Sequence, residues 1–248
     1  MSSVTAGEAR ELAERLEGAP LAEALRFALT TFGDGLRVAC SFGVEDMVLL
    51  HEVARVGASL SIKPRVFLLD TGRLHQETYD LAERVRERYG ITLDVYAPDT
   101  LAVEELVRSK GPNSFYRSVE DRRECCAIRK VRPLERALRG ATAWVTGMRR
   151  EQSPTRDAIE LVEVDPAREG LLKLNPLAHW TEAEVWAFVA EHGPPTHALH
   201  ERGYPSIGCA PCTRAVEPGE STRTGRWWWE DAGHKECGLH PRLTKDLD

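Results

Sequence analysis

Hydrophobic side chains recur one helical turn apart near the start of the chain. Leu12 and Leu16 form one such pair and Leu21 and Leu25 another, with a Gly-Ala-Pro sequence between the two pairs. Apolar residues at this spacing make one face of a helix, and glycine and proline interrupt helical patterns. The pattern predicts two helices that serve packing within residues 8–32.

From residue 36 onward, short apolar runs alternate with stretches of helical periodicity. The apolar runs predict strands at residues 36–40, 65–70, 92–96 and 143–147, and helical patterns at residues 44–56, 76–89 and 101–110 follow the first three. Strands and helices that alternate at this spacing are typical of parallel βαβ units. We therefore predict an α/β fold with a doubly wound, mostly parallel sheet.

The pattern changes after this alternation. Residues 159–164 and 171–175 read as extended segments, and Thr181 with Glu184 forms the capping box of a further helix. Beyond residue 195 the sequence is irregular and rich in Gly, Pro and polar residues. We divide the chain into N-terminal helices (1–35), an α/β nucleotide-binding domain (36–195) and a C-terminal segment (196–248).

Polar turns follow three of the predicted strands. They are Ser41-Phe42-Gly43, Thr71-Gly72-Arg73 and Met148-Arg149-Arg150. Ligands of parallel sheets bind beyond the carboxyl ends of the strands, and the backbone amides at a helix N-terminus attract anions. These turns carry the small, polar or cationic side chains that a nucleotide phosphate requires, although the first of them is also typical of an ordinary capped helix.

Composition sets outer limits on function. The chain has 248 residues, of which 42% are hydrophobic and 29% charged, and no run approaches the ~18 apolar residues of a membrane span. Its start lacks a signal-peptide pattern, so we expect a cytoplasmic protein that does not enter membranes. The net charge of −6 argues against nucleic-acid binding. A basic cluster within residues 122–132 still suits a small anion.

Two pairs of cysteines supply four soft ligands. Cys125 and Cys126 are adjacent, and Cys209 and Cys212 form a C-x-x-C pair far downstream. Four thiolates suit a tetrahedral zinc ion or a cubane iron–sulfur cluster, and such a site would couple metal binding to folding. Adjacent ligands fit a cluster with several iron corners better than a zinc ion. The alternatives are a vicinal disulfide or unrelated buried thiols.

A further cysteine lies in the C-terminal tail. Cys237 stands between Lys235 and His240, and nearby cations lower the pKa of a thiol. A reactive thiolate and a surface cysteine without a role are equally consistent with the tail alone.

Together these motifs resemble the iron–sulfur branch of the assimilatory sulfonucleotide reductases, which act on adenosine 5′-phosphosulfate (APS). The resemblance covers most of the chain from about residue 36, and the first 35 residues add nothing to it. It rests on Ser41-Phe42-Gly43-Val44-Glu45-Asp46, Leu69-Asp70-Thr71-Gly72-Arg73, Cys125-Cys126 with Lys130, Thr146-Gly147-Met148-Arg149-Arg150-Glu151-Gln152-Ser153, Cys209-x-x-Cys212, Gly225-Arg226-Trp227-Trp228-Trp229-Glu230 and Lys235-Glu236-Cys237-Gly238-Leu239-His240.

The resemblance implies an adenine nucleotide alpha hydrolase-like fold and a two-step reaction. The Cys237 thiolate attacks the sulfur of APS, AMP leaves, and reduced thioredoxin or a glutaredoxin-like reductant releases sulfite from the S-sulfocysteine. A [4Fe–4S] cluster is implied on Cys125, Cys126, Cys209 and Cys212. The residues that offset the charge of the sulfate are then Lys130, Arg223, Arg226 and His240. Those that hold the nucleotide are Ser41, Gly43, Thr71 and one of Arg149 or Arg150.

Three other functions stay open. The cluster-free branch, which reduces the 3′-phosphorylated substrate, lacks the four cysteines found here, and a dual-specificity enzyme is a variant of that alternative. ATP pyrophosphatases and tRNA-thiolating enzymes carry Ser-Gly-Gly-x-Asp-Ser where this chain has Ser41-Phe42-Gly43-Val44-Glu45-Asp46. A zinc module that binds nucleic acid through its tryptophans conflicts with the net acidity. The sequence does not fix the oligomeric state, and a homo-oligomer is one possibility.

Overall fold

A six-stranded sheet forms the centre of the computed structural model, which describes residues 4–153, 156–168, 170–230 and 238–239. The strand order is β3-β2-β1-β4-β6-β5. The strands are β1 (Leu36–Ala39), β2 (Val66–Leu69), β3 (Leu93–Tyr96), β4 (Ala143–Val145), β5 (Val162–Val164) and β6 (Leu172–Leu174). Neighbouring strands are parallel except β5, which runs antiparallel to β6. The predicted doubly wound, mostly parallel sheet is confirmed.

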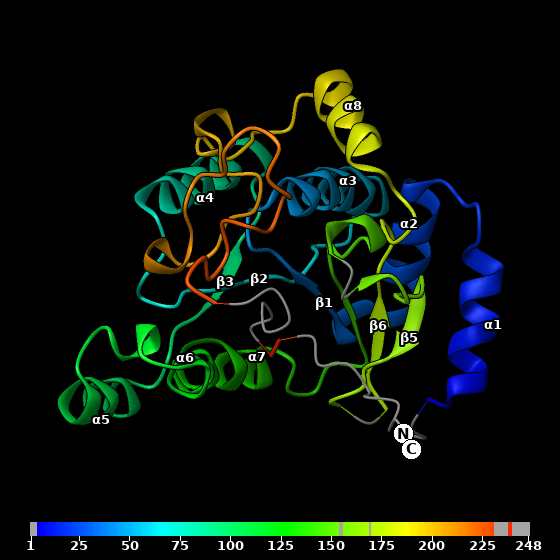
Figure 1. Ribbon diagram of the computed structural model, residues 1–248. Helices are drawn as coiled ribbons and strands as arrows, with labels where there is room; N and C mark the ends of the chain where they lie inside the picture. The colour runs from blue at the N-terminus through cyan, green and yellow to red at the C-terminus, as the bar shows by residue number, and fades with distance from the viewer. Residues whose placement is uncertain (1–3, 154–155, 169, 231–237, 240–248) are drawn as a thin grey trace, which may run out of the picture.

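Helices cover both faces of this sheet (Figure 1). The long helices are α1 (Ala6–Leu16), α2 (Leu21–Phe32), α3 (Val44–Leu60), α4 (Gln76–Tyr89), α5 (Thr100–Lys110) and α8 (Glu182–His192). Helix α3 contacts α2 and α8 on one face, and the short helix α7 (Arg132–Ala137) contacts β2 and β3 on the other. The helices predicted in the first 110 residues are therefore confirmed.

The hydrophobic core explains how the N-terminal helices attach. Leu16 of α1, Leu25 of α2 and Val162 of β5 belong to one continuous buried cluster, and α1 packs along β5. The sequence pattern separates residues 1–35 from the α/β domain. The described residues of this segment nevertheless pack into the same core. Among the described residues, no helix is both long and apolar enough to cross a membrane.

A break in helical geometry follows the adjacent cysteines. Helix α6 (Val119–Cys126) ends at the second cysteine, and the next five residues, Ala127–Val131, form a π-helix that leads into α7. Turns of this kind occur often at functional sites, because they re-aim side chains along a helix. This turn contains Arg129 and Lys130.

Candidate functional site

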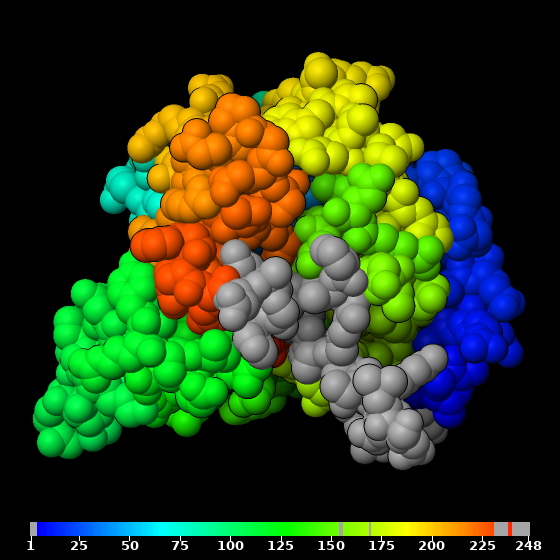
Figure 2. Space-filling view, in the orientation of Figure 1, coloured from blue at the N-terminus to red at the C-terminus, as the bar shows by residue number. Residues whose placement is uncertain are grey.

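A cavity of about 220 Å³ opens beyond the carboxyl ends of β1, β2 and β4. The order of the strands reverses at β1, since β2 lies on one side of it and β4 on the other. Open α/β sheets bind ligands at this kind of switch point. Figure 2 shows the C-terminal segment (orange) at the surface next to the residues coloured green to yellow-green. Six predicted site residues line the cavity: Ser41, Gly43, Thr71, Lys130, Arg223 and Arg226.

The turn after β1 is closed by a carboxylate. The backbone N–H of Ser41 donates to Asp46 at 2.5 Å, and the Ser41 hydroxyl donates to the same oxygen at 2.7 Å. Phe42 has φ 63° and is fully buried, while Gly43 is the N-cap of α3. Burial raises the pKa of Asp46 to about 6, although both Ser41 hydrogen bonds oppose this rise. Asp46 therefore fixes the shape of the turn.

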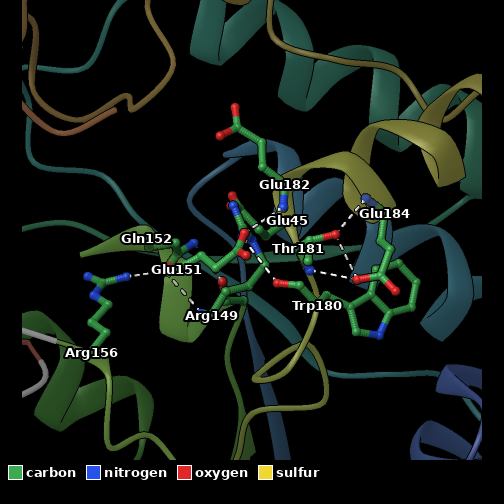
Figure 3. A network of polar contacts seen from close by, with 10 residues as sticks. Glu45, Arg149, Glu151, Gln152, Arg156, Trp180, Thr181, Glu182 and Glu184 are labelled. Carbon is green, nitrogen blue, oxygen red and sulfur yellow. Dashed lines mark hydrogen bonds and ion pairs between the residues drawn. The ribbon is translucent and has the colours of Figure 1, made fainter. Parts of the chain in front are cut away.

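Arg149 lies beside this turn but does not line the cavity. Its buried guanidinium donates to Glu45 at 2.9 and 3.0 Å and to the Trp180 carbonyl at 3.2 Å, as Figure 3 shows. Arg150 points elsewhere, and its Nε donates to the Ile159 carbonyl at 2.7 Å. Neither of these two arginines, one of which we expected to hold the nucleotide, lines the cavity.

The cavity is also lined by residues to which the sequence interpretation gave no role in the site. Arg156 donates to Gln152, and the pair lies on the far side of the network from Thr181 (Figure 3). The additional lining residues include Cys40, Asp46, Gln152, Arg156 and Leu239. The available signal for Arg156 was weak, because it is one arginine among several in a polar loop.

A second, smaller cavity brings the four cysteines together. Cys125 and Cys126 reach it from the end of α6, and Cys209 and Cys212 reach it from a short 3₁₀ turn (Ala210–Cys212). None of the four is in a disulfide bond, so the structure has no vicinal disulfide at Cys125 and Cys126. We call this the thiol cavity. Its other lining residues are Arg73, Phe115, Arg122, Arg129, Lys130, Pro211 and Trp227.

Backbone and side-chain contacts hold the C-x-x-C turn against the middle of the chain. The Ala210 N–H donates to the Arg73 carbonyl at 2.8 Å, and the Tyr116 hydroxyl donates to the Pro211 carbonyl at 2.7 Å. The Thr71 hydroxyl lies 3.2 Å from the Cys209 sulfur. Burial raises the pKa of Cys209, but nearby Lys130 and the Thr71 contact outweigh it and lower that pKa overall.

The thiol cavity has the donors for a thiolate-ligated group. Four soft thiols and several cations surround it, and positive charge suits a group that carries net negative charge. Within the described part of the chain, no three or more His, Cys, Asp or Glu side chains are arranged to hold a metal ion. One tetrahedral ion needs its sulfurs about 2.3 Å from a common point, whereas a multi-iron group spreads its ligands over several metal atoms.

Two residues form the wall between the cavities. Lys130 and Trp227 line both of them. Trp227 is buried with φ 42°, and the guanidinium carbons of Arg122 and Arg226 each lie 4.8 Å from its ring. Arg122 lines the thiol cavity and forms a buried ion pair with Glu230 at 2.6 Å. The indole thus contacts one cation from each cavity.

Cys237 and His240 lie outside the described residues. Leu239, which stands between them in the sequence, lines the larger cavity and packs against the buried cluster that contains Phe67 and Trp144.

Comparison with known proteins gives matches along most of the chain. The phosphoadenosine phosphosulfate reductase domain matches residues 35–215. The chain is 53% identical over 207 residues to an adenosine 5′-phosphosulfate reductase of Burkholderia cepacia, which covers 84% of this chain and 81% of the relative. It is 49% identical over 245 residues to the chloroplastic 5′-adenylylsulfate reductase 3 of Arabidopsis thaliana, covering 95% of this chain. The chain spans 52% of that plant relative's length.

Solved structures give the same picture for the fold. A phosphoadenylyl-sulfate reductase from Candida auris, in a phosphate complex, superposes with a TM-score of 0.73 at 28% identity, over 87% of this chain and 99% of the other. Yeast FAD synthetase superposes with a TM-score of 0.53 at 15% identity, over 85% of this chain and 75% of the other, which shows a shared fold alone.

Proposed function

This chain belongs to the phosphoadenosine phosphosulfate reductase domain family, and we propose that it reduces APS to sulfite and AMP in sulfate assimilation. The observation that carries the proposal is the thiol cavity, which shares Lys130 and Trp227 with a cavity at the switch point of the sheet. The names of the bacterial and plant relatives support APS as the substrate.

The larger cavity suits the nucleotide and its two anionic groups. The Ser41 turn, Gly43 at the start of α3 and Thr71 are proposed to hold the phosphate end. Arg156 takes the place there that we expected for Arg149 or Arg150, because it lines the cavity and they do not. Lys130, Arg223 and Arg226 line the same cavity and are proposed to offset the charge of the sulfonate.

The thiolate of Cys237 is the proposed nucleophile. It forms a bond to the sulfur of APS while the bond from that sulfur to the phosphate oxygen breaks, and AMP leaves with the electron pair. Leu239, which follows Cys237 by two residues in the sequence, lines the cavity, and this supports the proposal. His240 is proposed to assist as a further cation.

A dithiol protein, thioredoxin or a glutaredoxin-like reductant, is proposed to complete the cycle. One of its thiolates attacks the sulfur of Cys237 in the S-sulfocysteine, sulfite leaves, and its second thiol displaces Cys237 to form the reductant's disulfide. Atoms and electrons then balance, because the two electrons that reduce the sulfonate to sulfite come from the dithiol.

The four cysteines of the thiol cavity are proposed to hold a [4Fe–4S] cluster. When bound, such a group would supply fixed charge beside Lys130 and would join the C-terminal segment to α6. A cytoplasmic location and a homo-oligomer stay predictions.

Mass spectrometry of the S-sulfocysteine tests this function. With APS and no reductant, the peptide that contains Cys237 should gain one SO₃ unit, which thioredoxin should remove with release of sulfite. Cys237→Ser should keep its iron and bind AMP but release no sulfite, since a serine hydroxyl is a far weaker nucleophile than a thiolate. An adduct on Cys40, which also lines the cavity, or normal turnover in Cys237→Ser would contradict the proposal.

Competition between sulfonucleotides tests the substrate. Turnover should favour APS over the 3′-phosphorylated substrate by more than tenfold, which corresponds to about 1.4 kcal/mol. Equal turnover of both would instead indicate a dual-specificity enzyme.

A further inference from the structure

The guanidinium of Arg226 is held at three points within the cavity wall. Its Nη1 donates to the Ile207 carbonyl at 3.0 Å and to the Ser206 hydroxyl at 3.4 Å, and its Cζ lies 4.8 Å from the Trp227 ring. The residue is only 7% exposed. Its Nε is buried with no hydrogen-bond partner among the residues that the structure describes. A donor of this kind is costly to leave unsatisfied unless a ligand accepts from it.

Gly208 packs directly against this guanidinium. A Cβ added to Gly208 would lie 2.3 Å from Nη2, 2.5 Å from Cζ and 3.1 Å from Nε of Arg226. These three distances put the added carbon above the plane of the guanidinium and not beyond one of its edges. Gly208 has no positive φ, so its backbone would accept alanine without strain. Glycine is therefore needed at this position for the space that Arg226 occupies.

We propose that Gly208 is a positioning residue for Arg226. The missing side chain lets the guanidinium lie flat between Gly208 and Trp227, which keeps its Nε–Nη2 edge available for two oxygens of the sulfonate. Arginine binds oxyanions most strongly through such a two-donor edge. This inference rests on the proposed function, since the sulfonate is the anion that Arg226 would bind.

The position of Gly208 in the chain makes the assignment testable. It precedes Cys209, a residue of the thiol cavity, so a purely structural role would appear as damage to that cavity. The clash in Gly208→Ala is instead with the far end of a flexible side chain, which can move without unfolding the protein. The variant should therefore fold with the same iron content as wild type, and only the Arg226 side chain should be displaced.

Measurements of AMP binding and of APS turnover distinguish a positioning role of Gly208 from a purely structural one. Gly208→Ala should lower kcat/KM for APS by about 10- to 100-fold, since loss of one donor to a developing anion typically lowers kcat by 10²–10³. Its Kd for AMP should stay within about twofold of wild type, because AMP carries no sulfonate. Gly7→Ala is the matched control, since a Cβ there meets no atom closer than 3.8 Å and Gly7 lies in α1, away from both cavities.

A double variant gives the sharpest result. Gly208→Ala should cost no further activity in an Arg226→Ala background, because the group that the methyl would displace is then absent. A further tenfold loss in that background, loss of iron or folding in Gly208→Ala, or an equal loss of AMP affinity would overturn the inference. A wild-type protein that releases no sulfite from APS would instead show that the proposed function is wrong.

Discussion

Asp46 makes the stability of this protein depend on pH in a direction opposite to most carboxylates. Its folded-state pKa is raised from 3.8 to about 6, chiefly by burial. The folded protein therefore keeps this proton at pH values where the unfolded chain has lost it. The stabilising effect is complete below pH 3.8 and is lost as pH rises towards 6. A shift of this size corresponds to about 3 kcal/mol.

Asp46→Asn isolates this effect from the other titrating groups. An asparagine side chain has no charge, and its carbonyl still accepts the hydrogen bond from the Ser41 N–H. The variant is expected to lose the hydrogen bond from the Ser41 hydroxyl, which lowers its unfolding free energy by about 1 kcal/mol at every pH. Between pH 4.5 and 7.5, wild type should lose about 2 kcal/mol of unfolding free energy relative to the variant.

Urea unfolding of both proteins across this pH range measures the difference. Asp34→Asn, which removes an exposed carboxylate, is the control for the loss of one ionisable group. A difference between wild type and Asp46→Asn that does not change with pH would refute the reasoning. A difference of the opposite sign would show that the Ser41 hydrogen bonds outweigh burial.

Two further substitutions test the packing around the cavities. Gly147→Ala would place a Cβ 2.3 Å from Oδ1 of Asp46, whose carboxylate Ser41 holds through Oδ2. We therefore expect a loss of about 1–3 kcal/mol in urea unfolding and a higher KM for APS. Unchanged stability would mean that the turn is more adaptable than its contacts indicate. Arg122→Met would leave Glu230 buried without its ion-pair partner and should lower stability by about 3–5 kcal/mol. The exposed pair of Arg86 with Glu83 is the comparison, because solvent screens it and Arg86→Met should leave the unfolding free energy nearly unchanged.

The sheet was predictable because its strands are short, buried apolar runs. Residues of β1, β2 and β4 are almost entirely inaccessible, and such strands have continuous hydrophobic sequences. The helices between them bury one face and so carry a visible periodicity. Helix α6 was not predicted because it lacks this periodicity: only Arg122 and Cys126 are buried within it, and they make no apolar stripe.

The ion pair of Arg149 was not predictable from local sequence. Its motif places two arginines in a polar loop after a strand, which is where a phosphate ligand would stand. The partner of Arg149 is Glu45, 104 residues earlier, at the start of α3. Which arginine pairs with an acid and which lines the cavity depends on how β4 lies beside β1, a long-range arrangement that no local pattern contains.

Lys130 lies where the thiol cavity meets the larger cavity. It lies four residues after Cys126, so a regular helix would already place both side chains on one face. The π-helix at Ala127–Val131 adds a residue to that turn, and Lys130 lines the larger cavity as well as the thiol cavity. A cation in this wall is attracted by negative charge on either side, and burial strengthens that attraction by lowering the local dielectric. If the cysteines hold the proposed cluster, its charge and the charge of a bound anion would therefore be linked through one ammonium group.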